Sequence, residues 1–387
     1  MKKLVIRVLI AIGVIVGALL IGIGLTLATW ALRPNRAQVD PRIVLETHDL
    51  VKDGLHNSNT DFVKLGGRYW LAFVSSPFHF GSTESRLHLR VADSPLGPWT
   101  DVSSFKAPGD DIRDPKLAVI GGRLFLYALE NRDFKAEPYR TVFSSSADGT
   151  TWDEFRTLPG LDGWLLWRTL EVKGEAYATA YWWEHGRAVL LRSPDGVRWS
   201  IVSTINEGER NDETEAVLLP DGRLRATARL EYDESWADGA FGDPRGSTLV
   251  LESFPPYDSW KQLSESRLTR LDGPALFTWG GRTFAVGRYQ DGTAWPAPQG
   301  SCLARKRTSL FEIRADGLVR ITDFPSSGDT SYGGVVVEGD SAWATYYSSP
   351  PARDWAWILG MFSPTAVRIA KINLKAAADK AAAIAAR

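Results

Sequence analysis

The 387-residue chain is poor in the residues that build disulfides and metal sites. Its single cysteine, Cys302, excludes an internal disulfide and a zinc site made of cysteines. Its five histidines are scattered and show no HxxxH or comparable spacing. We therefore expect neither a metal centre nor another cofactor.

An excess of charge of one sign is also missing. The 45 basic and 46 acidic residues leave a net charge of −1, which argues against a nucleic-acid-binding protein that works through bulk charge. The chain has no P-loop, and no glycine-rich turn lies between a strand and a helix. Neither a nucleic acid nor a nucleotide is therefore an expected partner.

One long hydrophobic run stands at the N-terminus. Residues 8–32 carry no charge and are flanked by Lys2, Lys3 and Arg7 on one side and by Arg33 and Arg36 on the other. This run of about 25 residues is longer than a bilayer requires and longer than the apolar part of a cleavable signal. We predict an uncleaved signal anchor over residues 1–37. The protein would be a single-pass membrane protein with its body outside the cytoplasm.

The rest of the chain is rich in tryptophan and glycine, with 16 and 35 residues. Between about residues 40 and 374 there is no sustained 3.6-residue periodicity. Short β-rich runs instead recur between Gly, Pro and Asp turns, a pattern typical of an all-β chain.

A repeated unit organises these runs. Each copy has an opening strand, a glycine-containing turn, an aromatic-rich second strand, a longer loop and a third strand. The six copies begin at Thr60, Arg113, Trp167, Glu213, Asp272 and Thr330. Six such sheets arranged radially form a β-propeller, which we predict over residues 38–375. The runs at 42–47 and 366–374 would complete the last blade, and the Ala-rich tail, 376–387, would be a short helix or frayed end outside it.

Several copies end in the same short turn. It reads SADGTTW at 146–152 and SPDGVRW at 193–199, with a looser SPLGPW at 94–99. The Asp side chain can accept backbone N–H bonds, the Gly can take a positive φ, and the Trp can pack back between sheets. We therefore interpret this turn as structural and assign it no catalytic role.

The repeated turn and the six copies resemble the Asp-box (BNR-repeat) sialidases, which are exo-α-sialidase-like six-bladed propellers. The most specific match lies in ETEAVLLPDGRLRATAR, 213–229, where Glu213, Val217, the Asp-Gly turn and Arg229 follow the family's spacing. The resemblance implies that Glu213 activates a tyrosine nucleophile and that Arg229 binds a substrate carboxylate. The segments HNSNTDF, IRDPKL, WLLWRT and GDTSYGG are similar to an uncharacterised bacterial branch, and the last places Tyr332 at the nucleophile's position.

One segment departs from the family pattern. Sialidases open their first blade with Arg-Ile-Pro, whose Arg is the first of three that bind the substrate carboxylate. This chain has NTDF there, with Asp61 and no arginine, and its Arg42-Ile43-Val44 lies in the closing strand. The resemblance therefore implies the fold more strongly than it implies sialic acid as the substrate.

The propeller topology brings distant residues together at one rim of the central tunnel. The innermost strand of a blade starts at this rim, and the second strand returns to it. The strand starts supply Asp61, Asp114, Arg168, Glu213, Asp272 and Tyr332, and the second-strand ends supply Glu130, Trp182, Arg229, Arg288 and Tyr347. Aromatic rings stack on sugars, and arginines bind carboxylates in a bidentate manner. We therefore expect this rim to bind a glycan.

We hypothesise that the rim hydrolyses an anionic glycan. Glu213 would accept the phenol proton of Tyr332 as that oxygen attacks an anomeric carbon. Asp61 or Asp114 would protonate the leaving oxygen. The residues expected to bind the substrate are Arg229, Arg288, Arg168, Arg113, Tyr347 and Trp182.

These residues also have structural interpretations. Either Glu213 or its neighbour Glu215 could be solvated, and Arg229 could be the ion-pair partner of a nearby acid. Asp114 could start a turn before a proline. The ring of Tyr332 could simply be packed, and His56 could hydrogen-bond in a loop between blades.

Two other functions remain open from the sequence. The propeller could be catalytically inactive and bind glycans or proteins. Alternatively, it could be a five-bladed glycosidase of the arabinanase type, with Asp61, Asp114 and Glu213 as its three carboxylates.

Overall fold

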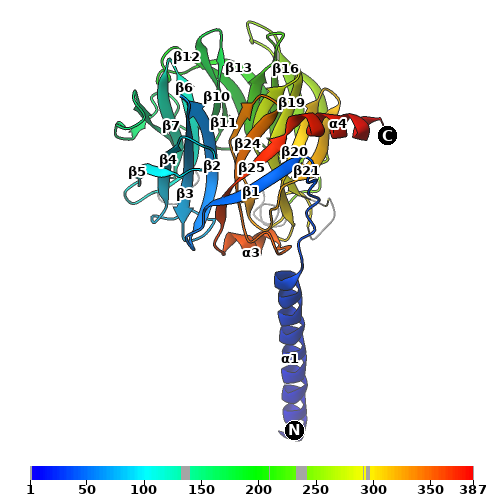
Figure 1. The fold of residues 1–387 in the computed structure, drawn as a ribbon. Coiled ribbons are helices and arrows are strands. Elements are labelled where there is room, and N and C mark those ends of the chain that lie inside the picture. The colour runs from blue at the N-terminus through cyan, green and yellow to red at the C-terminus, as the bar shows by residue number, and fades with distance from the viewer. Residues whose placement is uncertain are drawn as a thin grey trace.

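Six β-sheets surround a central axis in the computed structural model, which describes residues 2–131, 140–208, 210–231, 242–290, 292 and 297–386 (Figure 1). Five sheets have four strands, and the sixth joins strands from both ends of the chain. The structure therefore confirms the predicted six-bladed propeller and excludes the five-bladed architecture.

The strands follow one another outward in each blade. The first three blades are β2 (His56–Leu65), β3 (Arg68–Ser76), β4 (Arg86–Ala92) and β5 (Thr100–Phe105); β6 (Asp111–Ile120), β7 (Arg123–Asn131), β8 (Arg140–Ser146) and β9 (Arg156–Thr157); β10 (Trp164–Val172), β11 (Glu175–Trp182), β12 (Arg187–Ser193) and β13 (Ser200–Glu207). The next two are β14 (Asn211–Leu218), β15 (Leu224–Leu230), β16 (Ser247–Ser253) and β17 (Lys261–Ser266); β18 (Asp272–Trp279), β19 (Arg282–Gln290), β20 (Lys306–Arg314) and β21 (Gly317–Asp323).

The sixth blade closes the ring with strands from both ends of the chain. It contains β22 (Thr330–Ser331), β23 (Val335–Glu338), β24 (Ser341–Ser348), β25 (Ala366–Asn373) and β1 (Val44–Val51). The pairing of β1 with β25 is antiparallel and confirms the predicted closing pair. The innermost strands β2, β6, β10, β14, β18 and β23 contact one another in a closed ring.

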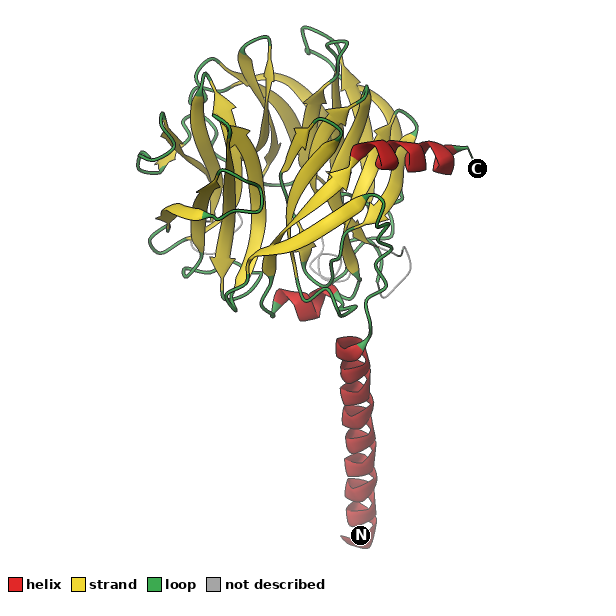
Figure 2. Cartoon of the chain, in the orientation of Figure 1, coloured by secondary structure: helices red, strands yellow, loops and turns green. Residues whose placement is uncertain are grey.

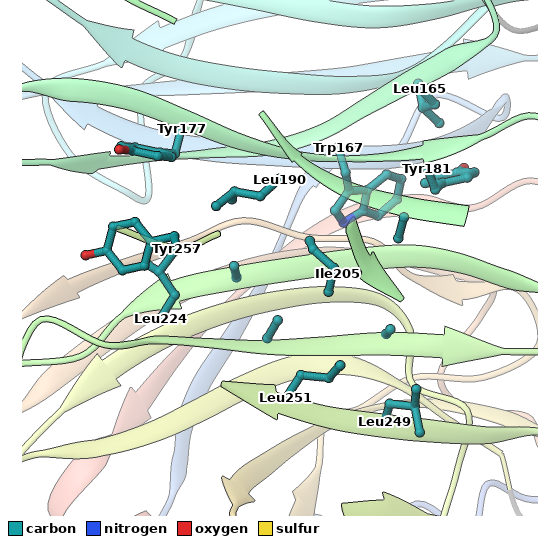
Figure 3. Packing of buried hydrophobic residues seen from close by; sticks show 14 of the residues in the cluster. Leu165, Trp167, Tyr177, Tyr181, Leu190, Ile205, Leu224, Leu249, Leu251 and Tyr257 are labelled. Carbon is teal, nitrogen blue, oxygen red and sulfur yellow. The ribbon is translucent and has the colours of Figure 1, made fainter. Parts of the chain in front are cut away.

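Side chains from facing sheets form the core between blades. Tyr177 and Leu190 of the third blade lie opposite Leu224, Leu251 and Tyr257 of the fourth (Figure 3). The rings of Tyr177 and Tyr257 meet edge to face with centroids 5.7 Å apart. Each fully buried Leu contributes about 1.5–3 kcal/mol relative to an exposed one, so this packing fixes the angle between neighbouring sheets.

The recurring Asp-Gly turn has the local geometry expected from its sequence. In the second blade, Asp148 accepts the N–H groups of Thr150 and Thr151, both at 2.8 Å. Gly149 has a φ of +74°, and a β-carbon there would come within 2.1 Å of the Trp70 ring in the preceding blade. The turn is therefore a packing device between blades.

Within the described part of the chain, three helices accompany the propeller: α1 (Lys2–Leu32), α3 (Trp357–Met361) and α4 (Leu374–Ala385) (Figure 2). Residues 3–29 of α1 are long and apolar enough to span a membrane. The Ala-rich tail forms α4, which packs against the sheets and buries Leu374, Ala377 and Ala381.

Candidate functional site

The innermost strands are irregular at the same rim of the tunnel. Strand pairing shifts register between Ser58 and Asp61, Arg113 and Lys116, Leu166 and Thr169, Asn211 and Thr214, and Asp272 and Ala275. In the sixth blade, the strand is interrupted between Ser331 and Val335. Bulges redirect side chains and are frequent next to active sites. The predicted strand-start residues therefore lie at or beside six equivalent irregularities.

Three of these positions also have unusual backbone angles. Asn59, Asp114 and Tyr332 have φ values of +50°, +51° and +48°. For residues other than glycine, such angles cost of the order of 1–3 kcal/mol each, and they concentrate at functional sites. The chain retains this strain at three adjoining blades of one rim.

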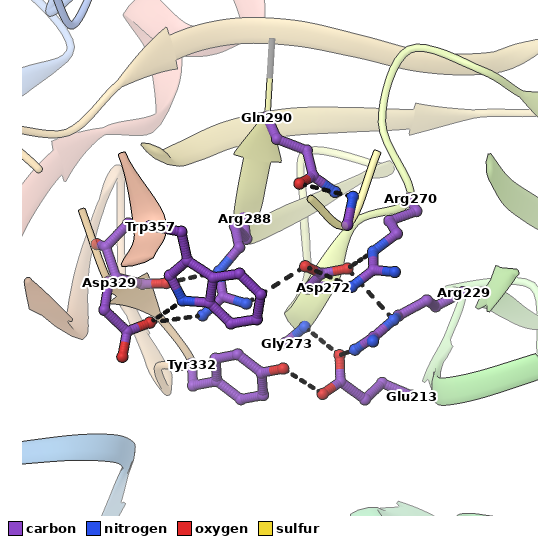
Figure 4. Close-up of polar contacts among 12 residues, drawn as sticks. Glu213, Arg229, Arg270, Asp272, Gly273, Arg288, Gln290, Asp329, Tyr332 and Trp357 are labelled. Atoms are coloured by element: carbon purple, nitrogen blue, oxygen red, sulfur yellow. Dashed lines mark hydrogen bonds and ion pairs between the residues drawn. The ribbon is translucent and has the colours of Figure 1, made fainter. Parts of the chain in front are cut away.

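Tyr332 and Glu213 form a direct hydrogen-bonded pair (Figure 4). The phenol of Tyr332 donates to Oε1 of Glu213. Oε2 accepts the Gly273 N–H at 2.6 Å and lies 2.8 Å from Nη1 of Arg229. Burial raises the pKa of Tyr332 well above its usual value, and the Glu213 charge adds to the effect. Burial also raises the pKa of Glu213, so a proton shared by the two groups is favoured over two charged oxygens.

Arg229 is surrounded by four carboxylates. Besides Glu213, its guanidinium pairs with Asp212 and Asp272, both at 3.3 Å, and with Glu231. Burial of the guanidinium would lower the pKa of Arg229, but these charges raise it well above its usual value. Arg229 is therefore a fully compensated cation within the protein.

Arg288 is compensated in a similar way. Its nitrogens lie 3.3 Å from Asp272 and 3.3 Å from Asp329, and they donate to the Thr330 carbonyl at 2.8 Å and the Tyr347 hydroxyl at 3.0 Å. The side chain is only 2% exposed. The structure thus brings Tyr332, Glu213, Arg229, Arg288 and Tyr347 into one network.

A second network joins Asp61 and Arg168 beside the first. Arg168 pairs with Asp61 at 2.5 Å and Glu215 at 3.1 Å, and donates to the Gly333 carbonyl at 2.9 Å. The other oxygen of Asp61 accepts the Leu117 N–H at 2.6 Å, and this side chain is fully buried. Glu215 is buried as well, and burial raises its pKa to about 7. Glu215 thus pairs with Arg168, and Glu213 is the acid that contacts Tyr332.

Three other predicted residues lie around these networks. Asp114 is partly exposed and accepts a hydrogen bond from Asn59. Arg113 pairs with Asp111 in the second blade. Trp182 packs on Trp164, with ring centroids 5.0 Å apart, and the described contacts of Trp182 do not include the Tyr332–Glu213 pair.

Sequence reasoning missed a buried carboxylate at this rim, Asp329. Asp329 Oδ1 accepts Tyr347 at 3.0 Å and Trp357 at 2.8 Å and pairs with Arg288. Oδ2 lies 3.0 Å from His56 Nε2 and 2.6 Å from His79 Nδ1. Burial would raise the pKa of Asp329, but the neighbouring cations lower it far below its usual range. Asp329 adjoins the TSYGG segment, whereas His79 lies in a β3–β4 connection that has no position in the repeat.

His56, His79 and Asp329 could also hold a metal ion, because one ligand atom from each lies within 4.8 Å of the others. Two imidazoles and a carboxylate suit zinc or iron(II). The expectation of no metal centre rested on sequence spacing, and these residues meet only in the fold. A second such group joins His185, Asp212 and Glu231. The carboxylates of both groups already have arginine partners, so the folded protein does not need an ion to balance them.

Comparison with known proteins identifies the fold. No family model matches the chain, and no curated protein matches it. A solved protein of unknown function from Dyadobacter fermentans is similar, with a TM-score of 0.59 and 14% identity over 86% of this chain and 100% of that one. Trypanosoma rangeli sialidase in complex with sialic acid has a TM-score of 0.59 and 11% identity. The match covers 85% of this chain and 55% of the sialidase.

A phage endosialidase extends the same likeness. The phi92 enzyme has a TM-score of 0.56 and 10% identity over 85% of this chain and 69% of that one. The chain thus has the six-bladed propeller fold seen in sialidases, and identities at this level establish the fold alone.

Proposed function

We propose that this protein is a membrane-anchored glycoside hydrolase that acts at the strand-start rim of its propeller. The observation that carries the proposal is the Tyr332–Glu213 pair, held at the tunnel between Arg229 and Arg288. A tyrosine hydrogen-bonded to a carboxylate is an activated nucleophile, provided that the base is itself oriented. Gly273 and Arg229 supply that orientation.

The proposed reaction uses the Tyr332–Glu213 pair in two steps. The Tyr332 oxygen attacks the anomeric carbon and forms a new C–O bond, and its proton passes to Glu213. The glycosidic bond breaks, and an acid protonates the leaving oxygen. A water molecule then attacks the anomeric carbon and gives its proton to the same acid, which is now a carboxylate. The sugar–tyrosine bond breaks, and Glu213 returns the first proton to the phenol oxygen.

Asp114 fits the role of the acid better than Asp61. Both oxygens of Asp61 are engaged, by Arg168 and by a backbone N–H, in a fully buried position. Asp114 is partly exposed and has Asn59 as a hydrogen-bond partner. A group that must deliver a proton to a substrate has to reach it, and Asp114 meets that condition.

The arginine contacts favour an uncharged sugar over the anionic one suggested by the sequence. Four protein carboxylates already surround Arg229, and Asp272 and Asp329 flank Arg288. A substrate carboxylate would have to compete with these internal partners, and displacing one would leave a buried charge unpaired. Arg168 is occupied in the same way by Asp61 and Glu215.

A glycoside panel tests the proposal on the full chain in detergent micelles. Sialyl, uronyl and neutral aryl glycosides are compared for release of the aryl group. We expect turnover of a neutral glycoside, and in Tyr332→Phe a loss of kcat on the order of 10³-fold or more with little change in Kd. Tyr177→Phe, in the third-blade core, is the matched control and should retain activity.

The possible outcomes separate the alternatives. Full activity in Tyr332→Phe removes the tyrosine from the mechanism. Faster release of the aryl group from sialosides than from neutral glycosides would show that the substrate is anionic. Binding of glycans by the wild-type protein without any turnover favours an inactive glycan-binding propeller.

A further inference from the structure

The N-terminal helix is fastened to the same side of the propeller that carries the candidate site. The indole N–H of Trp355 donates to the Ala31 carbonyl at 2.8 Å, and Arg353 donates to the Leu32 carbonyl at 3.0 Å. Both acceptors belong to the last turn of α1. Figure 1 shows α1 leaving the propeller beside α3, which begins two residues after Trp355.

The linker after α1 is held against the propeller body. Arg33 pairs with Asp354 at 3.2 Å. The Asn35 side chain donates to the carbonyls of Ser326 and Pro351 at 2.9 and 2.6 Å. A linker with these contacts is not a free tether, whose ends would sample many separations. The propeller therefore keeps one rim towards the helix.

The chain that holds the helix continues directly into the site. Trp357 donates to Asp329 at 2.8 Å, and its ring centroid lies 5.4 Å from the Arg288 guanidinium and 3.1 Å from Lys306 Nζ. Figure 4 shows Trp357 beside Arg288 and Asp329. Tyr332 lies next to this group, and its phenol points towards Glu213. The helix end and the site network are thus joined within a few residues, 353–357.

Two exposed aromatic rings project from this rim. Phe362, directly after α3, is 63% exposed, and Phe80 is 46% exposed. Their ring centroids are 5.7 Å apart. Phe80 adjoins His79, whose N–H donates to the Met361 carbonyl at 2.9 Å. Exposed apolar side chains clustered in this way mark an interaction surface, and a bilayer interface would bury them.

We propose that this rim faces the bilayer that holds α1 and that the site takes the sugar headgroup of a glycolipid in the same membrane. The inference rests on the proposed glycan function and names the carrier of the glycan. Confinement of protein and lipid to one surface raises their effective concentration. A short, docked linker would keep the Tyr332–Glu213 pair on that side.

Site-specific labels test the orientation independently of any sugar. The background is Cys302→Ser, because the Cys302 carbonyl accepts the Ile358 N–H of α3 and a label there would disturb the rim. A fluorophore is attached to Phe362→Cys or to Phe254→Cys, which is 59% exposed on the opposite rim. The full chain is placed in phosphatidylcholine vesicles with lipid-attached quenchers. We expect quenching at 362 and not at 254; quenching at 254, or at neither position, overturns the proposal.

Whether the glycan is attached to a lipid is tested by comparing a glycolipid with the same glycan free in solution. Turnover is measured on a glycolipid in phosphatidylcholine vesicles and on the same glycan as a soluble oligosaccharide. We expect the glycolipid to be preferred. The double variant Phe80→Ser/Phe362→Ser should lose on the order of tenfold or more on vesicles and remain unchanged on the soluble glycan. Phe254→Ser is the matched control.

The other outcomes of these experiments would overturn the glycolipid as ligand or the glycan function itself. Equal turnover of both forms, or an equal loss in Phe254→Ser, overturns the glycolipid as ligand. Failure to bind the sugar in either form overturns the proposed glycan function and the glycolipid with it. The label result then shows by itself whether the rim still faces the membrane.

Discussion

Glu213 and Glu215 lie two residues apart on one strand, yet they have different surroundings. The spacing to Arg229 predicted that Glu213 belongs to the site, and the two side chains do meet at 2.8 Å. Sequence could not show that Arg229 is also held by acids from other segments. One of them, Glu231, directly follows β15. The other, Asp272, belongs to the neighbouring blade and lies at a bulge of β18, which the residue pattern does not reveal.

Glu215 should make stability depend on pH. Burial raises its folded-state pKa from 4.5 to about 7. Its contribution to stability is therefore complete below pH 4.5 and is lost as pH rises through 7. The free energy of unfolding of the wild type, relative to Glu215→Gln, should fall by roughly 3 kcal/mol between these limits.

Urea unfolding of the full chain in detergent at several pH values measures this difference. Glu207→Gln, at an exposed position in the third blade, is the control and should follow the wild type. If Glu215→Gln has the same pH dependence as the wild type, the buried carboxylate does not titrate in this range.

At the scale of the element, the irregular start of each inner strand matters most. The repeat predicted where each strand begins, because turns and aromatic alternation recur in every copy. The bulges themselves were not predictable, since alternation over two residues cannot show where one residue is inserted. The β3–β4 connection was missed for a related reason, because it has no counterpart in the other copies.

A substitution at Gly273 tests whether the bulge between Asp272 and Ala275 positions the Tyr332 ring. Gly273 has a φ of +58°, and an added β-carbon would lie 2.7 Å from Cγ of Tyr332. Gly280 has a φ of +57° and no atom within 4 Å of such a carbon. Alanine at either position should cost about 1–2 kcal/mol of stability through backbone strain. Only Gly273→Ala should also displace the phenol.

We expect Gly273→Ala to lower kcat by on the order of tenfold or more, with Gly280→Ala close to wild type. Thermal unfolding of both variants measures the cost of backbone strain. Glycoside turnover of both variants measures the effect of displacing the Tyr332 ring. Equal activities in the two variants would show that the ring position does not depend on this glycine.

At the scale of the whole molecule, the sequence predicted the six blades and the pair of strands that closes them. Both depend on local signals that recur along the chain. The direction in which the site faces could not be predicted. It follows from the docking of residues 31–33 on the segment 353–355, and these contacts join parts of the chain about 320 residues apart.

In the proposed mechanism, Tyr332 at this rim forms a covalent bond with a sugar. Covalent trapping with a 2-fluoro analogue of the best substrate, followed by peptide mass spectrometry, tests it most directly. Fluorine at C2 slows hydrolysis of a sugar–enzyme bond, so the intermediate accumulates. We predict one adduct, located by fragmentation at Tyr332 and absent from Tyr332→Phe. An adduct on Glu213, Asp114 or another carboxylate, with continued turnover by Tyr332→Phe, would contradict this role of Tyr332.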